Sequence, residues 1–320
     1  MAPGDVVQSV LAPAGTPATS IHQLWQVMLW TSAAVFALVM AFIAAACMRS
    51  ASSPKDPDTP ATSERALTRA VASAVTLTVV ILVGLLTSSV WTTAAVDAVR
   101  AESAVSVHVV GHQWWWEIEY EDAVPSRRVL TANELHVPLH QPIAVKVESR
   151  DVIHSFWVPN LQGKQDLIPG MPTAIWVQAD RAGRFRGQCA EFCGLQHAKM
   201  AFDVVAEPEA DFERWLDSLR APAVQPSNEQ ERRGLALFET ERCARCHTIR
   251  GTEANGQVGP DLTHVGSRQT IASGTLLNTP AHRREWITNP QAIKPGNQMP
   301  PTPLADDELA ALVAYLGTLR

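Results

Sequence analysis

The 320-residue sequence has few charged residues, since Asp, Glu, Lys and Arg together make up 18%, and it has no basic block. Its formal net charge is −6. Nucleic-acid-binding proteins use basic patches to contact phosphates, so this pattern excludes a nucleic-acid partner. Cysteine is also scarce: Cys47 lies in an apolar run and the other four residues form two close pairs. Such a pair is either a disulfide in an oxidising compartment or a pair of metal ligands.

Two long apolar runs are present, roughly Leu24–Met48 and Ala70–Val96. Each exceeds the ~20 residues that a helix needs to cross ~30 Å of hydrocarbon, and neither has a charged residue in its interior. A signal peptide is the alternative for the first run, but no Lys or Arg precedes Arg49 and the run is too long. We therefore expect a transmembrane hairpin over residues 23–98 in a lipid bilayer, after an external N-terminal tail over residues 1–22.

The segment that joins the two runs is basic, with Arg49, Lys55, Arg65 and Arg69. Basic residues near the ends of membrane helices favour the cytoplasmic side, so this connection is expected in the cytoplasm. Both termini, and everything after Asp97, are then expected on the outer face of the membrane.

The rest of the chain is expected to form two further domains. Five short runs of β-branched or alternating residues, separated by turn residues, favour a sandwich or barrel over residues 99–219. These runs are residues 105–110, 128–130, 143–147, 174–177 and 202–205. A short helix is expected over residues 209–219, and two prolines within residues 220–228 indicate a linker. Residues 229–320 are predicted to be helical at both ends and rich in loops between.

The first group of candidate ligands lies within twelve residues, from Cys189 to Met200. It offers two thiolates, an imidazole, a thioether and a carboxylate, and the soft sulfur ligands with imidazole select copper over magnesium or calcium. Two thiolates four residues apart can bridge two metal ions. Each copper then needs one imidazole, for which His197 and, from another segment, His154 are the candidates.

A disulfide or a zinc site would account for less of this pattern. A Cys189–Cys193 disulfide would leave His197 and Met200 without a role. A zinc site is disfavoured by the methionine and by the lack of further Cys or His at zinc-finger spacing. His154 taken alone would more often be a core histidine than a ligand, and only the neighbouring loop makes it a candidate.

The second group of candidate ligands begins with Cys243-Ala-Arg-Cys246-His247, the attachment pattern of haem c. Two thiols add to the haem vinyl groups, and His247 supplies one axial ligand. Met299, in Pro-rich surroundings, offers the second, and a thioether opposite imidazole raises the reduction potential. His264 and His282 are rival axial ligands. A thioredoxin-like motif is the alternative, but no βαβ pattern surrounds the cysteines.

The loop Gly187–Met200 resembles the CuA loop of cytochrome oxidase subunit II. The aromatic stretch Gly111–Tyr120 and the segment Asp166–Gly170 resemble the same family. This resemblance implies a cupredoxin-like Greek-key β-barrel in which Trp114 is the point where electrons reach CuA. It implies that Glu191 faces a Mg²⁺ at the border with subunit I. The implied CuA ligands are His154, Cys189, Cys193, His197, Met200 and the backbone carbonyl of Glu191.

Residues 229–320 resemble an all-α class I cytochrome c domain. In that family a proline like Pro260 orients the axial histidine, and the terminal helices cross through a small residue and an aromatic, as Gly234 and Tyr315 would here. Together the two resemblances imply a fused, caa-type haem–copper oxidase subunit II in a bacterial plasma (inner) membrane.

The implied function is electron transfer to an enzyme whose oxygen chemistry is on another subunit. The expected partners are subunit I, subunit III and an external cytochrome or other donor. A CuA subunit of a nitric oxide reductase is an alternative. The copper domain of nitrous oxide reductase is another, but ten histidines leave no histidine-rich catalytic cluster for it. A third alternative is subunit II of a quinol oxidase, which has lost CuA. The presence of every copper ligand in this sequence argues against it.

Overall fold

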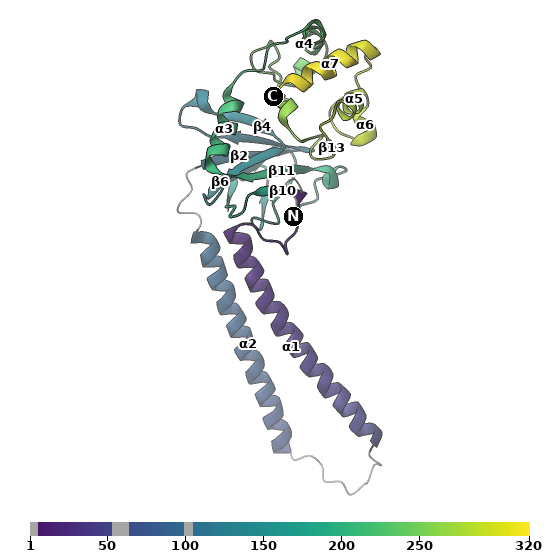
Figure 1. The fold of residues 1–320 in the computed structure, drawn as a ribbon. Helices are drawn as coiled ribbons and strands as arrows, with labels where there is room; N and C mark the ends of the chain where they lie inside the picture. The colour runs from purple at the N-terminus through teal and green to yellow at the C-terminus, as the bar shows by residue number, and fades with distance from the viewer. Residues whose placement is uncertain (1–5, 53–63, 99–104) are drawn as a thin grey trace. The chain divides into compact units, whose positions relative to one another are not determined.

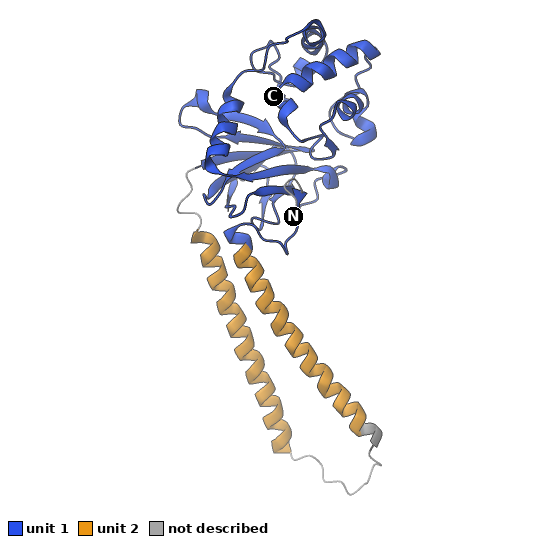
Figure 2. Cartoon of the chain, viewed as in Figure 1, with its two compact units in different colours: residues 1–18, 99–320 blue, residues 19–98 orange. Residues whose placement is uncertain are grey.

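The computed structural model describes residues 6–52, 64–98 and 105–320 (Figure 1). The chain divides into two compact units, residues 1–18 with 99–320 and residues 19–98 (Figure 2). Lys55, one of the basic residues of the expected cytoplasmic connection, lies outside the described residues.

Two long helices, α1 (Thr16–Ser52) and α2 (Glu64–Ala98), contain the apolar runs. Both are long and apolar enough to cross a membrane, which confirms the prediction of two such helices. Their apolar side chains face outward: Trp30 is 70% exposed and Trp91 is 72% exposed. Helices that are apolar on the outside need an apolar environment, as a lipid bilayer provides.

The β domain consists of two sheets, one in the order β5-β11-β10-β7-β8 and the other in the order β4-β3-β2-β6-β9. All five predicted runs overlap strands, namely β2, β4, β6, β9 and β11. The strands are β2 (Val105–His112), β3 (Trp115–Tyr120), β4 (Val129–Ala132), β5 (Glu134–Pro138), β6 (Ile143–Ser149), β7 (His154–Trp157), β8 (Lys164–Leu167), β9 (Thr173–Val177), β10 (Gly183–Cys189) and β11 (Ala201–Glu207).

Alternation along the strands builds the core of this domain. In β2 the side chains of Val107 and Val109 are fully buried, because every second residue of a strand faces the same side. Trp116 is also fully buried and contacts Phe156 and Phe202 edge-on, at ring-centroid distances of 6.2 and 5.3 Å. Nε1 of Trp116 lies 3.5 Å from the Met200 carbonyl oxygen, so this aromatic cluster contacts the loop that carries the candidate copper ligands.

The N-terminal segment packs on the same domain. The short strand β1 (Val6–Val7) pairs in parallel with β10, and the Ala14 N–H donates to the Asn160 carbonyl at 2.7 Å. A Cβ at Gly15 would lie 2.0 Å from the carbonyl oxygen of Gln178, so the backbone approaches too closely for any other residue. Residues 6–18 are thus part of the β unit, although the sequence pattern indicates only a tail.

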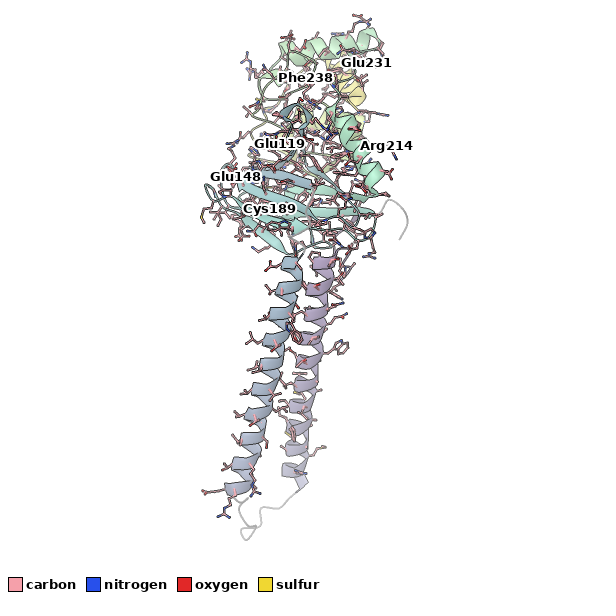
Figure 3. All side chains as sticks on the ribbon, turned by 90° about the vertical axis from the view of Figure 1, so that its left-hand side faces the viewer. Glu119, Glu148, Cys189, Arg214, Glu231 and Phe238 are labelled. Carbon is pink, nitrogen blue, oxygen red and sulfur yellow. The ribbon has the colours of Figure 1, made fainter. Side chains whose placement is uncertain are left out.

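The C-terminal part is helical. Its helices are α4 (Glu229–Thr240), α5 (Pro280–Thr288), α6 (Pro290–Ile293) and α7 (Asp306–Thr318), joined by loops and a two-stranded ladder of β12 (Thr270–Ile271) and β13 (Leu276–Leu277). Helix α3 (Glu209–Arg220) ends the β domain, as expected. Helices α4 and α7 cross at Gly234, where a Cβ would lie 2.3 Å from the Ala311 carbonyl oxygen and 2.6 Å from Tyr315 Cβ. Figure 3 labels Phe238 in this part and Cys189 in the β domain.

Candidate copper and haem centres

The loop between β10 and β11 brings the five predicted copper-binding side chains together. The Sγ of Cys189 lies 3.9 Å from Nδ1 of His154. The Sγ of Cys193 lies 3.7 Å from Nδ1 of His197 and 3.7 Å from Sδ of Met200. The ligand atoms of His154, Cys189 and Cys193 all lie within 4.8 Å of one another, and the three residues are buried. Neither cysteine is in a disulfide, so both thiols are free to bind metal.

Backbone groups complete this arrangement. The carbonyl oxygen of Glu191 lies 3.1 Å from the Sγ of Cys189, which suits it as the predicted sixth ligand. The Glu191 carboxylate points elsewhere: it lies 3.6 Å from Lys164 Nζ and is 44% exposed.

Residues around the ligands hold their orientation. Asp151 accepts a hydrogen bond from Nε2 of His154 at 2.8 Å, which leaves Nδ1 for the metal. The carbonyl of Cys193 accepts hydrogen bonds from Gln113 Nε2 at 2.8 Å and from Trp114 Nε1 at 2.9 Å. The sequence pattern alone assigns no role to Asp151 or Gln113. A carboxylate three residues before a candidate ligand histidine is the one signal that could have indicated Asp151.

The thiols and imidazole of this site interact electrostatically. The neighbouring Cys193 thiol lowers the pKa of Cys189, while the same contact and burial raise the pKa of Cys193, because two close sulfurs do not both ionise readily. Burial opposes a charge on His154, but its hydrogen bonds to Asp151 and Cys189 raise its pKa overall. A bound cation would remove the repulsion between the two thiolates, as is expected of a metal site.

The predicted haem ligands converge on a separate cavity of about 290 Å³, which is lined by the C-terminal domain and by a few β-domain residues such as Trp114. Cys243, Cys246, His247, Pro260 and Met299 all line it. Nδ1 of His247 is 2.8 Å from the Pro260 carbonyl oxygen, which accepts its hydrogen bond and leaves Nε2 available to a metal. Burial lowers the pKa of His247 and so favours the neutral imidazole that binds metals.

Two observations indicate that this cavity suits a flat cofactor that carries carboxylates. A Cβ at Gly259 would lie 2.6 Å from Cε1 of His247, so only glycine leaves room for the imidazole ring. The guanidinium of Arg268 is buried, lines an adjoining cavity of about 110 Å³ with His247 and Met299, and has an Nε without a partner. A buried cation needs a counter-charge, and the carboxylates of a haem would supply one.

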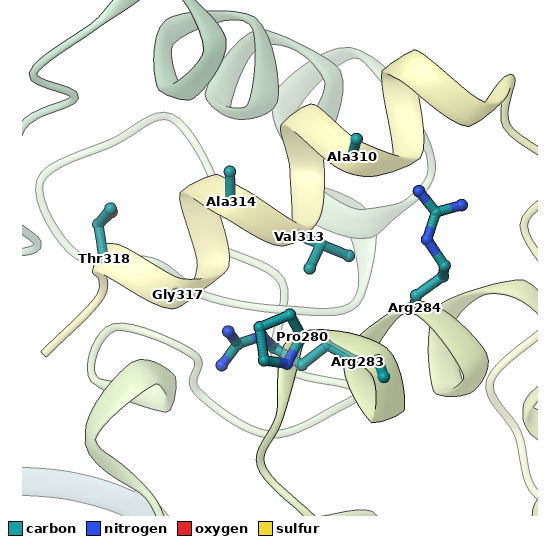
Figure 4. Close-up of a pocket in the computed structure, with 9 residues that line it drawn as sticks. Pro280, Arg283, Arg284, Ala310, Val313, Ala314, Gly317 and Thr318 are labelled. Atoms are coloured by element: carbon teal, nitrogen blue, oxygen red, sulfur yellow. The ribbon is translucent and has the colours of Figure 1, made fainter.

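The rival ligands lie outside these two cavities. His264 contacts the Ala221 carbonyl at 3.1 Å, and His282 contacts the Leu277 carbonyl at 2.8 Å. A larger hollow of about 650 Å³ lies between α5 and α7, lined by residues such as Pro280 and Ala314 (Figure 4). It contains none of the predicted ligands, so size alone does not locate the site.

Family comparisons match the two candidate centres separately. Residues 124–207 match the family model "Cytochrome C oxidase subunit II, periplasmic domain", and residues 231–320 match "Cytochrome c". Each model thus matches one of the two parts described above, and we refer to these parts as the subunit II domain and the cytochrome c domain after the models. The first match lies in the β domain, and the second covers the helical domain with the Cys-X-X-Cys-His motif.

Relatives of the chain are named as oxidase subunits. It is 35% identical over 225 residues to a cytochrome c oxidase subunit 2 of Alkalihalophilus pseudofirmus, covering 70% of this chain and 64% of the relative. It is 32% identical over 232 residues to that of Bacillus subtilis, covering 69% and 64%. The chain thus spans just under two thirds of these relatives' length. A crystal structure of the periplasmic domain of subunit II of cytochrome oxidase of Bradyrhizobium japonicum is 29% identical, covers 37% of this chain and 95% of that one, and has a TM-score of 0.35.

One tryptophan of the subunit II domain lies between the two centres. Trp114 donates to the carbonyl of the candidate copper ligand Cys193 and also lines the candidate haem cavity. An added Cβ at Gly194, in the copper loop, would lie 3.2 Å from Trp114 Cζ2, and one at Gly296, near Met299, would lie 3.8 Å from its Cη2. The indole therefore contacts segments of both domains, and only 8% of its surface is exposed.

Proposed function

We propose that this chain is the electron-transfer subunit of a respiratory haem–copper terminal oxidase. The observation that carries the proposal is the position of Trp114 between the copper loop and the haem cavity. With their groups bound, the two sites supply one-electron carriers that pass electrons from an external donor through haem c and CuA to subunit I, where oxygen is reduced to water.

The residues of the chain hold these carriers in place. Cys243 and Cys246 would attach the haem, with His247 and Met299 as axial ligands. His154, Cys189, Cys193, His197, Met200 and the Glu191 carbonyl would hold the two coppers. Burial in a rigid β domain limits ligand movement when an electron arrives, and the surrounding hydrogen bonds tune the potential. Glu191, whose carboxylate is partly exposed, is the candidate Mg²⁺ ligand facing subunit I.

The membrane helices and the packing of residues 6–18 support a location for the protein. This segment contacts the β domain, so the residues before α1 lie on the same side of the bilayer as both redox domains. We place both termini on the outer, periplasmic or extracellular side of a bacterial plasma membrane. The partners would be subunit I, subunit III and an external cytochrome donor.

A variant without haem c tests the relay. The purified oxidase with Cys243→Ala and Cys246→Ala keeps the copper ligands but cannot attach haem, and Cys47→Ala, in α1, is the matched control. With soluble cytochrome c as donor, we expect oxygen consumption to be lost in the double variant and kept in the control. Unchanged turnover with the copper spectrum intact would reject the relay. Nitric oxide consumption by the wild-type complex would instead support the nitric oxide reductase alternative.

A further inference from the structure

Two loops of the cytochrome c domain contact the subunit II domain. The first, residues 293–297, leads from α6 towards Met299. The second, residues 272–274, has positive φ at three consecutive residues: 51° at Ala272, 60° at Ser273 and 70° at Gly274. Non-glycine residues rarely adopt this conformation, and they keep it only where their surroundings fix it. The contacts of the second loop with the subunit II domain are such surroundings.

Polar groups of the subunit II domain bind the backbone of both loops. Three donors reach carbonyls across the interface: Ala201 N to Ser273 O at 3.1 Å, Gln196 Nε2 to Pro295 O at 2.7 Å, and Lys199 Nζ to Ile293 O. All three donors lie in or directly after the copper loop. The interface therefore joins the segment that holds the copper ligands to the segment that ends at the axial methionine.

Lys294 connects the two loops to Trp114. Its Nζ donates to the Trp114 carbonyl at 2.8 Å and to the Ala272 carbonyl at 3.3 Å. The residue is 3% exposed, and no carboxylate pairs with it among the ion pairs of the described residues. It is the only lysine in residues 229–320, a stretch with nine arginines. Burial lowers the pKa of Lys294 to about 7, because a charged amine is costly away from water, and the two carbonyls accept its N–H groups in either protonation state.

We propose that Lys294 is a positioning residue for electron transfer within this chain. By bonding one carbonyl of each domain, it holds loops 272–274 and 293–297 against Trp114 and fixes the cytochrome c domain where the haem cavity meets that indole. The proposal rests on the proposed function, because positioning matters only if electrons cross from haem to copper. It assigns Lys294 no contact with either metal.

The test compares Lys294→Met, Lys146→Met and wild type as complete, metal-loaded oxidase. Methionine keeps the length and removes the donor, which leaves two carbonyls unpaired and lowers the equilibrium constant for docking roughly tenfold. Lys146 lies on the domain surface, 53% exposed and paired with Glu121, so its loss is expected to cost little. One readout is hydrogen exchange of the Ala201 amide, whose acceptor Ser273 O lies across the interface. The other is haem-to-copper electron transfer after flash reduction of the haem.

In Lys294→Met we expect roughly tenfold faster exchange at Ala201 and roughly tenfold slower transfer, with unchanged haem and copper contents and absorption spectra. Lys146→Met should match wild type. Unchanged electron transfer would overturn the proposal. This holds even if exchange at Ala201 becomes faster, because the contact would then be merely structural. If Lys294→Met does not accumulate with its haem, Lys294→Gln replaces it in the test: its side chain is shorter and cannot hold both carbonyls, so the same two changes are expected at smaller size, and unchanged transfer would again overturn the proposal. Absence of any haem-to-copper transfer in wild type would reject the proposed function instead.

Discussion

Replacing Gly111 by alanine should loosen copper binding without touching a ligand. Gly111 lies in β2, and an added Cβ would lie 2.9 Å from Cδ2 and 3.1 Å from Cγ of the His154 ring. Carbon atoms prefer about 3.5–4.0 Å, so the ring must move by roughly 0.5 Å or more. The ring cannot move freely, because it is fully buried and bonded to Asp151 at 2.8 Å. Metal sites tolerate displacements of only ~0.5 Å before their geometry degrades.

The size of the effect follows from the cost of overpacking. Extra methyl groups in a tight core cost about 1–3 kcal/mol, which is about 5–150-fold in affinity if the strain falls on the metal-bound state. The copper-to-haem ratio of the purified chain measures the loss, and the mixed-valence spectrum reports the remaining site. Gly317→Ala is the matched control, since its added carbon meets only the end of the flexible Arg283 side chain. A full copper content and an unchanged spectrum in Gly111→Ala would refute His154 as a copper ligand.

Two further predictions concern the haem ligand and the pH dependence of stability. Met299→Ala should lower the haem reduction potential and let carbon monoxide bind the iron, which a redox titration and a CO difference spectrum would detect. Burial opposes a charge on His136, but its contacts with Glu134 and Glu207 raise its pKa overall. Its stabilising effect is therefore complete below the unfolded pKa of about 6.5 and lost as pH rises through the higher folded value. The melting temperature of the wild type should therefore fall more between pH 6 and pH 9 than that of His136→Gln. Equal slopes of melting temperature against pH would contradict this.

The candidate ligands could be found from the sequence because most of them are local. Cys189 to Met200 and Cys243 to His247 each occupy a few consecutive residues, so spacing and chemistry alone indicate metal and haem. His154 is distant in sequence and was indicated only by the need for a second imidazole. The structure places its Nδ1 3.9 Å from the Cys189 sulfur, because β7 and β10 pair through Phe156 and Cys189.

The strands were predicted less completely than the ligands. The runs with clear alternation were found, whereas β1 has only two residues, Val6 and Val7, which is too short for any periodic signal. Strand β5 is buried at all five residues and shows no alternation to detect. Part of the aromatic stretch follows the alternation of a strand: Trp116 is fully buried, whereas its neighbour Trp115 is only partly buried. Trp114 precedes that strand in a turn, and its burial comes from contacts with other segments.

The contact between the two redox domains had no signal in the sequence. The prolines of residues 220–228 indicate a short linker between the domains. Such a linker raises the effective concentration of one domain near the other. Such a connection brings the domains together but selects no orientation. Orientation comes from specific contacts, and these join residues as far apart as Trp114 and Lys294. Loss of the Lys294 amine would leave the connection intact and remove part of the orientation, so the two contributions to electron transfer can be separated in one chain.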